Sequence, residues 1–257
     1  MFYNKLVIRT HSKKTKTRTY TVTIHRKGNI TKYEIIKVAS RMFLEEGYSK
    51  TTIRSIASEL EISPGHLMFY FPTKDHLLCE VVDMLCDFQW RLIKRVTEGG
   101  GSQIMAICFE LTTMAAACEE SEIARDLYIS SYTHPITLEK IRKNDAERAH
   151  EIFGEYCQGW SEVQFLEAET LISGIEYSTL MTTESSSPLD VRISGALNAL
   201  MMIYNVPEEI RRDKINKALS MDYRSMGRQI LSEFINFVNE TTESMYEEYA
   251  FNKKNKI

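Results

Sequence analysis

The sequence predicts an all-α protein, and three observations carry this prediction. Apolar residues recur three and four positions apart along most of the 257-residue chain, which is the period of an amphipathic helix. Glycine and proline are few, at 11 and 5 residues, which favours long helices over the many turns of a β protein. No run of eighteen apolar residues occurs in the sequence, so we expect no membrane-spanning helix.

Residues 1–29 form a basic N-terminal arm with eight Lys or Arg residues and no acidic residue. From Arg18 to Arg26 polar and apolar residues alternate, which is typical of a strand, but no partner strand is evident. Two interpretations stay open. The arm follows DNA phosphates or enters a minor groove, or it is a solvated tail or upstream sequence added by a misplaced start.

The first helix is predicted to begin at Thr31, which can form a capping box with Glu34. Its inward residues repeat with the helical period: Ile35, Ala39, Met42 and Phe43. We expect Gly47 to end this helix, because glycine readily takes the left-handed conformation that closes helices, and Tyr48 to pack back onto it.

Thr51 to Lys74 reads as two short helices joined by a tight turn. Thr52 can cap the first of them, whose apolar stripe at i, i+3, i+4 and i+7 is Ile53, Ile56, Ala57 and Leu60. Glu61 and Ile62 make the turn.

The second short helix covers Pro64 to Tyr70, with Ser63 as its N-cap. Leu67 and Phe71 are its expected inward residues. A helix of about two turns buries little by itself, so its neighbours must hold it while its other face is presented outwards. This is the geometry of a helix-turn-helix, whose second helix enters the major groove of DNA.

A long helix over Lys74–Val96, capped by Thr73, is predicted to link this head to the rest of the chain. The run Gly99–Gly101 breaks it, and loops are expected at His134-Pro135, at Gly159 and at 185–188. Further helices are predicted over Gln103–Cys118, Glu122–Ser131, Ile136–Cys157, Val163–Met181, Leu189–Tyr204, Glu208–Leu219 and Tyr223–Tyr249, with a polar, basic tail after Phe251.

Charge is divided unevenly along the chain, whose net charge is −3. Residues up to His76 hold 14 Lys or Arg against 6 Asp or Glu, whereas residues from Leu77 onwards hold 18 against 29. A basic head suits a polyanion, and the acidic remainder would be repelled by DNA. We therefore expect the arm over 1–29, a DNA-binding domain over 30–76, and a regulatory and dimerisation domain over 77–257.

The stretch from Thr31 to Val82 resembles the DNA-binding head of the TetR family of bacterial transcriptional regulators. The matching residues read AS-MF-EEGY--TTI--IA from Ala39 to Ala57 and IS-G-L--YF--K--LL from Ile62 to Leu78. The resemblance implies an all-helical homodimer, a small-molecule pocket in each body, and repression that is released by the ligand.

Two residues depart from the family pattern. Where the family usually has glycine in the turn, this chain has Glu61, which we expect to fit if the backbone stays right-handed there. In the recognition helix, Met68 replaces a tyrosine whose hydroxyl often reaches a phosphate. The operator sequence therefore cannot be carried over from any relative.

Ten residues are predicted to contact DNA: Thr52, Arg54, Ser63, Pro64, Gly65, His66, Phe69, Tyr70, Thr73 and Lys74. Arg54 lies opposite the apolar stripe and can reach a guanine or a phosphate, or it is merely solvated. Thr52 and Thr73 lie at helix N-termini, which favour a phosphate, although plain helix caps would look the same. The resemblance places Lys74 at the DNA backbone.

Residues 63–66 form the leading edge of the recognition helix. Gly65 allows close backbone approach, and His66 can donate to a base or a phosphate. Phe69 and Tyr70 are too large to be both buried on so short a helix, so at least one should face the groove.

The rest of the chain offers no motif for catalysis. The five scattered cysteines read as buried small hydrophobes, and no cofactor or metal site is predicted. His134 and His150 invite an acid–base or metal reading, but we interpret the charges around them as a solvated helix face: Arg142, Asp145, Glu147, Arg148 and Glu151. Met and aromatic residues of the body line either a ligand pocket or plain core, and they identify no ligand.

We therefore predict a cytoplasmic, homodimeric DNA-binding regulator, most simply a repressor of a palindromic operator that a small-molecule effector releases. The alternative is a helical protein that binds DNA without sequence selectivity, or binds a partner, and lacks small-molecule control. Neither reading includes an enzyme or a membrane. For the dimer interface, three helices stay open: Val163–Met181, Leu189–Tyr204 and Tyr223–Tyr249.

Overall fold

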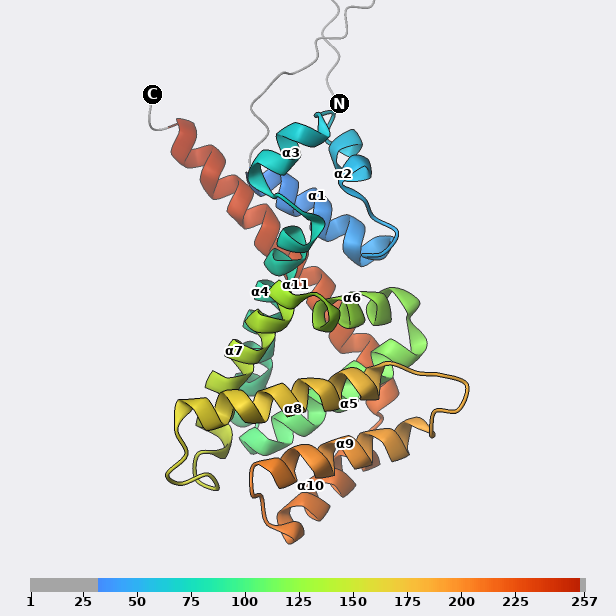
Figure 1. Cartoon of the computed structure of the whole chain (residues 1–257), viewed down its shortest axis with the longest axis vertical. Coiled ribbons are helices and arrows are strands. Elements are labelled where there is room, and N and C mark those ends of the chain that lie inside the picture. The colour runs from blue at the N-terminus through green and yellow to red at the C-terminus, as the bar shows by residue number, and fades with distance from the viewer. Residues whose placement is uncertain (1–31, 255–257) are drawn as a thin grey trace, which may run out of the picture. The chain divides into compact units, whose positions relative to one another are not determined.

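The computed structural model describes residues 32–254, with side chains up to residue 252. These residues form eleven α-helices (Figure 1), so the predicted all-α fold is confirmed. In chain order the helices are α1 Lys32–Glu45, α2 Ile53–Glu59, α3 Pro64–Tyr70, α4 Lys74–Glu98, α5 Gln103–Glu120, α6 Glu122–Thr133, α7 Pro135–Phe153, α8 Glu162–Leu180, α9 Leu189–Ile203, α10 Glu208–Ser220 and α11 Tyr223–Lys254. The basic arm over 1–29 and the Thr31 half of the predicted capping box lie outside the described residues.

Helix α7 departs from its predicted bounds at both ends. Pro135, expected in a loop, is its first residue, because the missing N–H and fixed φ of proline suit the first helical position. The helix ends at Phe153 rather than Cys157. There the backbone N–H groups of Tyr156 and Cys157 both donate to the Phe153 carbonyl, which closes the chain into a turn.

Helices α1 to α3 make the head and share a small apolar core. Its fully buried members are Ile35, Phe43, Ile56, Ala57 and Leu67. As predicted, Gly47 ends the first helical segment with a φ of +99°, and the Tyr48 ring lies 5.1 Å from the Phe43 ring. The turn of the head is therefore closed by an aromatic contact rather than left to solvent.

The turn between α2 and α3 corrects an expectation. Glu61 has a φ of +55°, so its backbone is left-handed and not right-handed. The N–H of Ile62 donates to the Ala57 carbonyl at 2.9 Å, and the N–H of Glu61 donates to the Ser58 carbonyl at 3.1 Å. This pair of bonds is a Schellman motif, which requires a left-handed residue and usually uses glycine.

Helix α11 is 32 residues long and packs along α5 and then along α1 (Figure 1). Gly227 permits its close approach to α5, because a Cβ at this position would lie 2.8 Å from the Thr113 carbonyl oxygen. Phe234 and Val238 are fully buried along its course. Near its end, Glu243 pairs with Lys37 of α1, so one helix contacts both the body and the head.

None of the described helices combines the length and the apolar run that a membrane crossing requires.

Candidate nucleic-acid interface

Helix α3 is held by its caps and by two buried residues. The Ser63 hydroxyl accepts a hydrogen bond from the His66 N–H at 3.2 Å, and Pro64 occupies the first helical turn. Leu67 is fully buried and Phe71 is 3% exposed, as the sequence predicts. These contacts fix a helix of seven residues that would be unstable alone.

The opposite face of α3 is open and aromatic. Phe69 is 82% exposed and Met68 48%, while Tyr70 is half-buried. The His66 ring stacks on the Tyr70 ring at 5.9 Å, and the Phe69 ring meets Tyr70 edge-on at 5.3 Å. The prediction that Phe69 and Tyr70 cannot both be buried is correct. Met68, which stands where the family usually has a tyrosine, also lies on this exposed face.

Helix α2 supports α3 and carries the next group of predicted contacts. The hydroxyl of Thr52 accepts from the Ser55 N–H at 3.0 Å, and the Ser55 hydroxyl accepts from the Thr52 N–H at 2.9 Å. This reciprocal pair is a capping box. Arg54 is exposed and forms no ion pair with another described residue, so its guanidinium can extend towards a ligand.

The start of α4 differs from the expected cap. Thr73 is the N-cap residue, but its side chain makes no capping bond and pairs instead with Nδ1 of His76 at 2.9 Å. The ammonium of Lys74 donates to the carbonyls of Tyr48 and Thr51 at 2.8 and 3.0 Å, and it lies 3.8 Å from the Tyr48 ring centre. Burial lowers the pKa of Lys74. Two of its three donors therefore already hold the loop between α1 and α2.

Tyr48 also connects this loop to the body. Its hydroxyl donates to Asp75 of α4, and its ring lies 5.5 Å from the ring of His134, the residue before α7. Burial, then Asp75, raises the pKa of Tyr48 far above its ordinary value, so the hydroxyl stays a donor. The head and the start of α7 thus meet at one aromatic residue.

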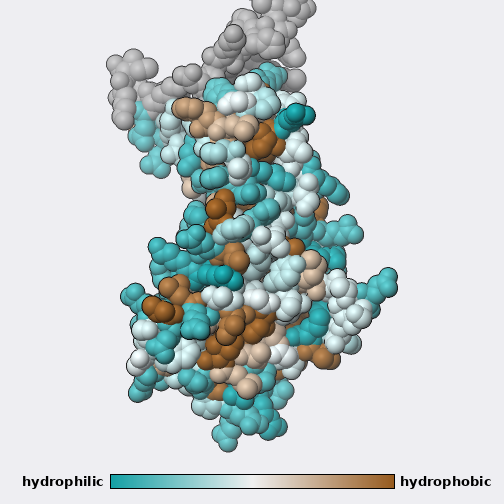
Figure 2. Space-filling view, in the orientation of Figure 1, coloured by the Kyte–Doolittle hydropathy of each residue, from teal (hydrophilic) through white to brown (hydrophobic). Residues whose placement is uncertain are grey.

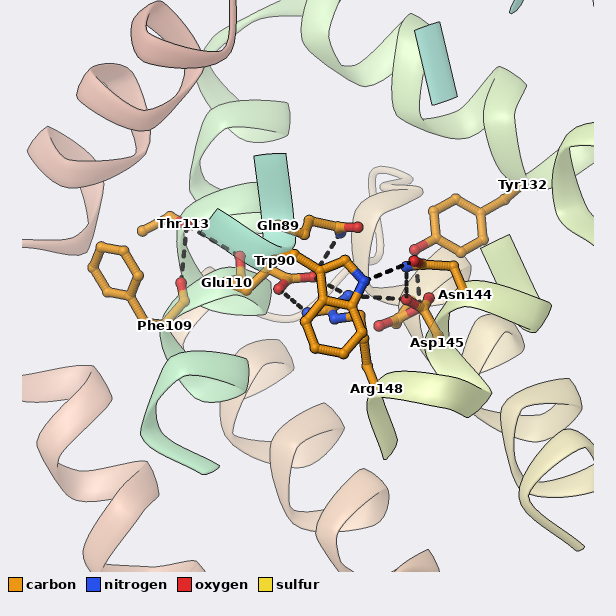
Figure 3. Close-up of polar contacts among 10 residues, drawn as sticks. Gln89, Trp90, Phe109, Glu110, Thr113, Tyr132, Asn144, Asp145 and Arg148 are labelled. Atoms are coloured by element: carbon orange, nitrogen blue, oxygen red, sulfur yellow. Dashed lines mark hydrogen bonds and ion pairs between the residues drawn. The ribbon is translucent and has the colours of Figure 1, made fainter. Parts of the chain in front are cut away.

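The body contains a buried ionic cluster that corrects part of the predicted solvated face on α7 (Figure 3). Glu147 and Glu151 are exposed as predicted, but Arg148 is buried. Arg148 is only 3% exposed and donates to both carboxylate oxygens of Glu110 on α5 and, at 2.9 Å, to Asp145. Burial alone lowers the pKa of the Arg148 guanidinium, but the two carboxylates outweigh it and raise that pKa. The sequence could not show this, because the partner Glu110 lies 38 positions away.

Further polar side chains surround this cluster. Gln89 donates to Glu110 at 2.6 Å, and the Trp90 indole donates to Asn144 at 3.1 Å (Figure 3). The Tyr132 hydroxyl donates to Glu176 at 2.9 Å, and Tyr204 donates to Glu169.

Neither the buried cysteines nor the other potential metal ligands of the described residues form a reactive or metal-binding site. Cys86, Cys108 and Cys118 are buried, and burial raises the pKa of each thiol to about 12, so they are inert under ordinary conditions. Among residues 32–252 no three His, Cys, Asp or Glu side chains are grouped to hold a metal ion.

Comparison with known proteins identifies the head. The profile of the tetR family of bacterial regulatory proteins matches residues 35–81. The chain is 30% identical over 112 residues to the HTH-type transcriptional regulator HbdR of Aromatoleum sp. (strain CIB), which covers 44% of this chain and 48% of HbdR. It is 32% identical over 80 residues to the HTH-type transcriptional regulator YuxN of Bacillus subtilis (strain 168), covering 31% of this chain and 28% of YuxN. The matches span half or less of the length of these relatives.

Two solved structures match the chain at low similarity. A gamma-butyrolactone receptor described as ArpA-like is 18% identical, with a TM-score of 0.39 over 77% of this chain and 95% of the other. CprB from S. coelicolor A3(2) is 16% identical, with a TM-score of 0.36 over 79% of this chain and 94% of CprB.

The matched profile covers α2, α3 and the turn between them, which are the elements that the exposed aromatic face depends on. The matched profile describes bacterial regulatory proteins, and the matched relative HbdR is a transcriptional regulator. Residues 35–81 therefore form a DNA-binding head that matches the TetR family of bacterial regulatory proteins.

Proposed function

We propose that this protein is a cytoplasmic, homodimeric repressor that binds a palindromic operator through α3 and leaves it when a small-molecule effector binds the body. The observation that carries the proposal is α3 itself. Its buried side is fixed by Leu67 and Phe71, and its opposite side exposes a row of side chains of the size that a major groove admits.

Each predicted DNA contact has a role in this proposal. Residues 63–66 lead α3 into the groove, and Phe69 and Tyr70 contact bases or sugars there. Arg54 reaches a guanine or a phosphate from α2. Thr52 and Thr73 hold phosphates at helix N-termini, and Lys74 uses its remaining N–H donor for a phosphate.

The dimer uses the outer faces of α8 and α9. Large apolar side chains are exposed on both helices: Val163, Leu166, Leu171, Val191 and Met202. Between them Gly174 and Gly195 have open space where a side chain would be, which allows a second copy to approach closely. Figure 2 shows a hydrophobic patch over the region of α8 and α9. The alternative helix, α11, is already covered by α5 and α1.

Helices that contact both the body and the head transmit the effect of ligand binding to α3. Helix α4 begins beside the Tyr48 loop and ends far into the body, at Glu98. A shift of α4 in each subunit changes the separation of the two α3 helices, which must match about 34 Å or a multiple of it. A coupling of about 1–3 kcal/mol gives roughly 5–150-fold release.

The test is an anisotropy titration of the full chain against its own upstream intergenic DNA and against scrambled DNA, across salt concentrations. We expect one palindrome to bind at least ~10³-fold more tightly than scrambled DNA at physiological salt. Equal, steeply salt-dependent binding to both would instead favour the alternative, a head that recognises only phosphates.

A further inference from the structure

A small cavity inside the body is lined by more acidic side chains than its one basic side chain can neutralise. Its volume is about 30 Å³, which is room for about two to three water-sized groups, since a water needs roughly 10–15 Å³. Four carboxylates and one guanidinium line it: Glu110, Asp145, Glu169, Glu176 and Arg148. The rest of the lining is largely apolar.

The guanidinium is used by only two of the four carboxylates. Arg148 donates to Glu110 and Asp145. Glu169 and Glu176 accept only from the hydroxyls of Tyr204 and Tyr132, and no Lys or Arg among the described residues pairs with either. Glu169 is 4% exposed, so a carboxylate there is shielded from water, and Arg148, the cation nearest in the lining, forms no ion pair with it. A buried charge of this kind is costly unless it is paired.

Arg148 supplies a second, independent sign that a ligand is accommodated here. Its Nε N–H is buried and has no hydrogen-bond partner among the described residues. Arg148 itself is 3% exposed and lines the same cavity. Buried donors are nearly always paired, so this one calls for an acceptor atom inside the cavity.

We propose that this cavity binds a small amine that also carries an acceptor oxygen, with the ammonium group between Glu169 and Glu176 and the oxygen accepting from Nε of Arg148. An ammonium has three donors, which matches two carboxylates that each already accept one hydroxyl. The apolar lining suits a short carbon chain between the two polar ends. A metal ion fits less well, because the described residues offer no grouped metal ligands.

The inference names the chemical class of the effector and so rests on the proposed function. It also predicts a pH dependence. Burial, and then Asp145, raises the pKa of Glu169 to about 8, and the same causes raise that of Glu176 well above its ordinary value. The charged groups that face them are Glu110 on α5 and Asp145 and Arg148 on α7, with the hydroxyls of Tyr132 and Tyr204. An ammonium favours the ionised carboxylates, so binding releases protons and tightens as pH rises from 6 to about 8.

The experiment is isothermal titration calorimetry of the full chain with ethanolamine, ethylamine and the neutral ethylene glycol. We expect saturable binding of ethanolamine, weaker binding of ethylamine, which lacks the oxygen, and none of ethylene glycol. In two buffers of different ionisation enthalpy the ethanolamine heats should differ by the protons released. Absence of saturable binding by both amines up to ~10 mM, about tenfold above a Kd of 1 mM, overturns the proposal, as does equal binding of ethylene glycol.

Variants locate the site. Glu169→Gln and Glu176→Gln should each weaken ethanolamine at least tenfold, whereas Glu167→Gln, an exposed residue of the same helix, should leave it unchanged. Thermal melting of each variant checks that it folds, and the comparison of ligands on the unaltered chain does not depend on the variants. Unchanged affinity in both site variants overturns the proposed location.

Operator binding, measured on the same preparation, separates this inference from the proposed function. Specific DNA binding without amine binding contradicts only the proposed ligand. Amine binding without specific DNA binding contradicts only the proposed repressor function and leaves the amine site supported.

Discussion

Asp126 on α6 accepts a hydrogen bond from the backbone N–H of Ser49, at 2.7 Å, and another from the Ser49 hydroxyl. Ser49 lies in the loop between α1 and α2, which Lys74 holds from its other side. Helix α6 therefore fixes the loop on which the orientation of α2 depends. One carboxylate joins the body to the DNA-binding head.

Replacing Asp126 with Ala should free this loop. Loss of the two bonds removes about 1–3 kcal/mol of local stability, since a typical hydrogen bond contributes about 0.5–1.5 kcal/mol. Hydrogen exchange measured by NMR should show faster exchange at Ser49 in Asp126→Ala. Glu122→Ala, an exposed change on the same helix, is the control. Equal exchange rates in the two variants would show that α6 does not restrain the loop.

Replacing Glu61 with Gly should stabilise the head. A left-handed residue other than glycine costs roughly 1–2 kcal/mol, whereas the flexibility of glycine in the unfolded chain offsets about 0.5–1 kcal/mol of the gain. We expect a net increase of up to about 1 kcal/mol in the free energy of unfolding, measured by urea denaturation. Glu61→Gln keeps the backbone penalty and removes only the charge. If Glu61→Gln stabilises as much as Glu61→Gly, the charge and not the φ of +55° is responsible.

Replacing Gly227 with Ala should destabilise the packing of α11 on α5. The added methyl would lie 2.8 Å from the Thr113 carbonyl oxygen, and backbone atoms can move away only by shifting a helix. Overpacking of this kind costs typically about 1–3 kcal/mol, which a thermal melt resolves. Gly65→Ala is the control, because nothing lies within 4 Å of its added methyl. A Gly227→Ala melt no lower than that of Gly65→Ala would contradict the close approach.

Stability should fall as pH rises through the range in which Glu169 ionises. Its pKa is raised from 4.5 to about 8 in the folded chain, chiefly by burial, so the folded state binds this proton more tightly than the unfolded state does. The fold is therefore favoured at low pH, and the free energy of unfolding declines between about pH 4.5 and 8. Urea unfolding at pH 5, 6, 7 and 8 should show a shallower decline in Glu169→Gln. Parallel pH profiles would mean that the carboxyl does not change its pKa on folding.

Introducing a charge at Gly195 should separate the proposed dimer without unfolding the chain. Nothing lies within 4 Å of a Cβ at this position, so Gly195→Glu is tolerated within one subunit. Facing a second copy, the buried charge has no partner and is strongly unfavourable. Analytical ultracentrifugation should find monomers for Gly195→Glu and dimers for Ser58→Glu, an exposed change on α2. A dimeric Gly195→Glu with a normal melting temperature would move the interface away from α9.

The sequence by itself determined the helices and their caps, because these depend on residues only a few positions apart. Ser63 and Pro64 start α3, Gly47 closes the segment after α1, and the described helices begin within one residue of the predicted positions. The DNA-binding head was also recognisable, since the profile match covers contiguous residues 35–81.

Only the tertiary structure decided which helix faces are buried and which residues take strained conformations. The charges of Asp145 and Arg148 have the spacing of a solvated helix face, yet Glu110 of α5 draws Arg148 inside. Glu61 looks compatible with a right-handed turn, but the packing of α3 on α2 imposes the left-handed one. These outcomes depend on contacts between distant segments, whose free energies outweigh local preference and leave no trace in local spacing.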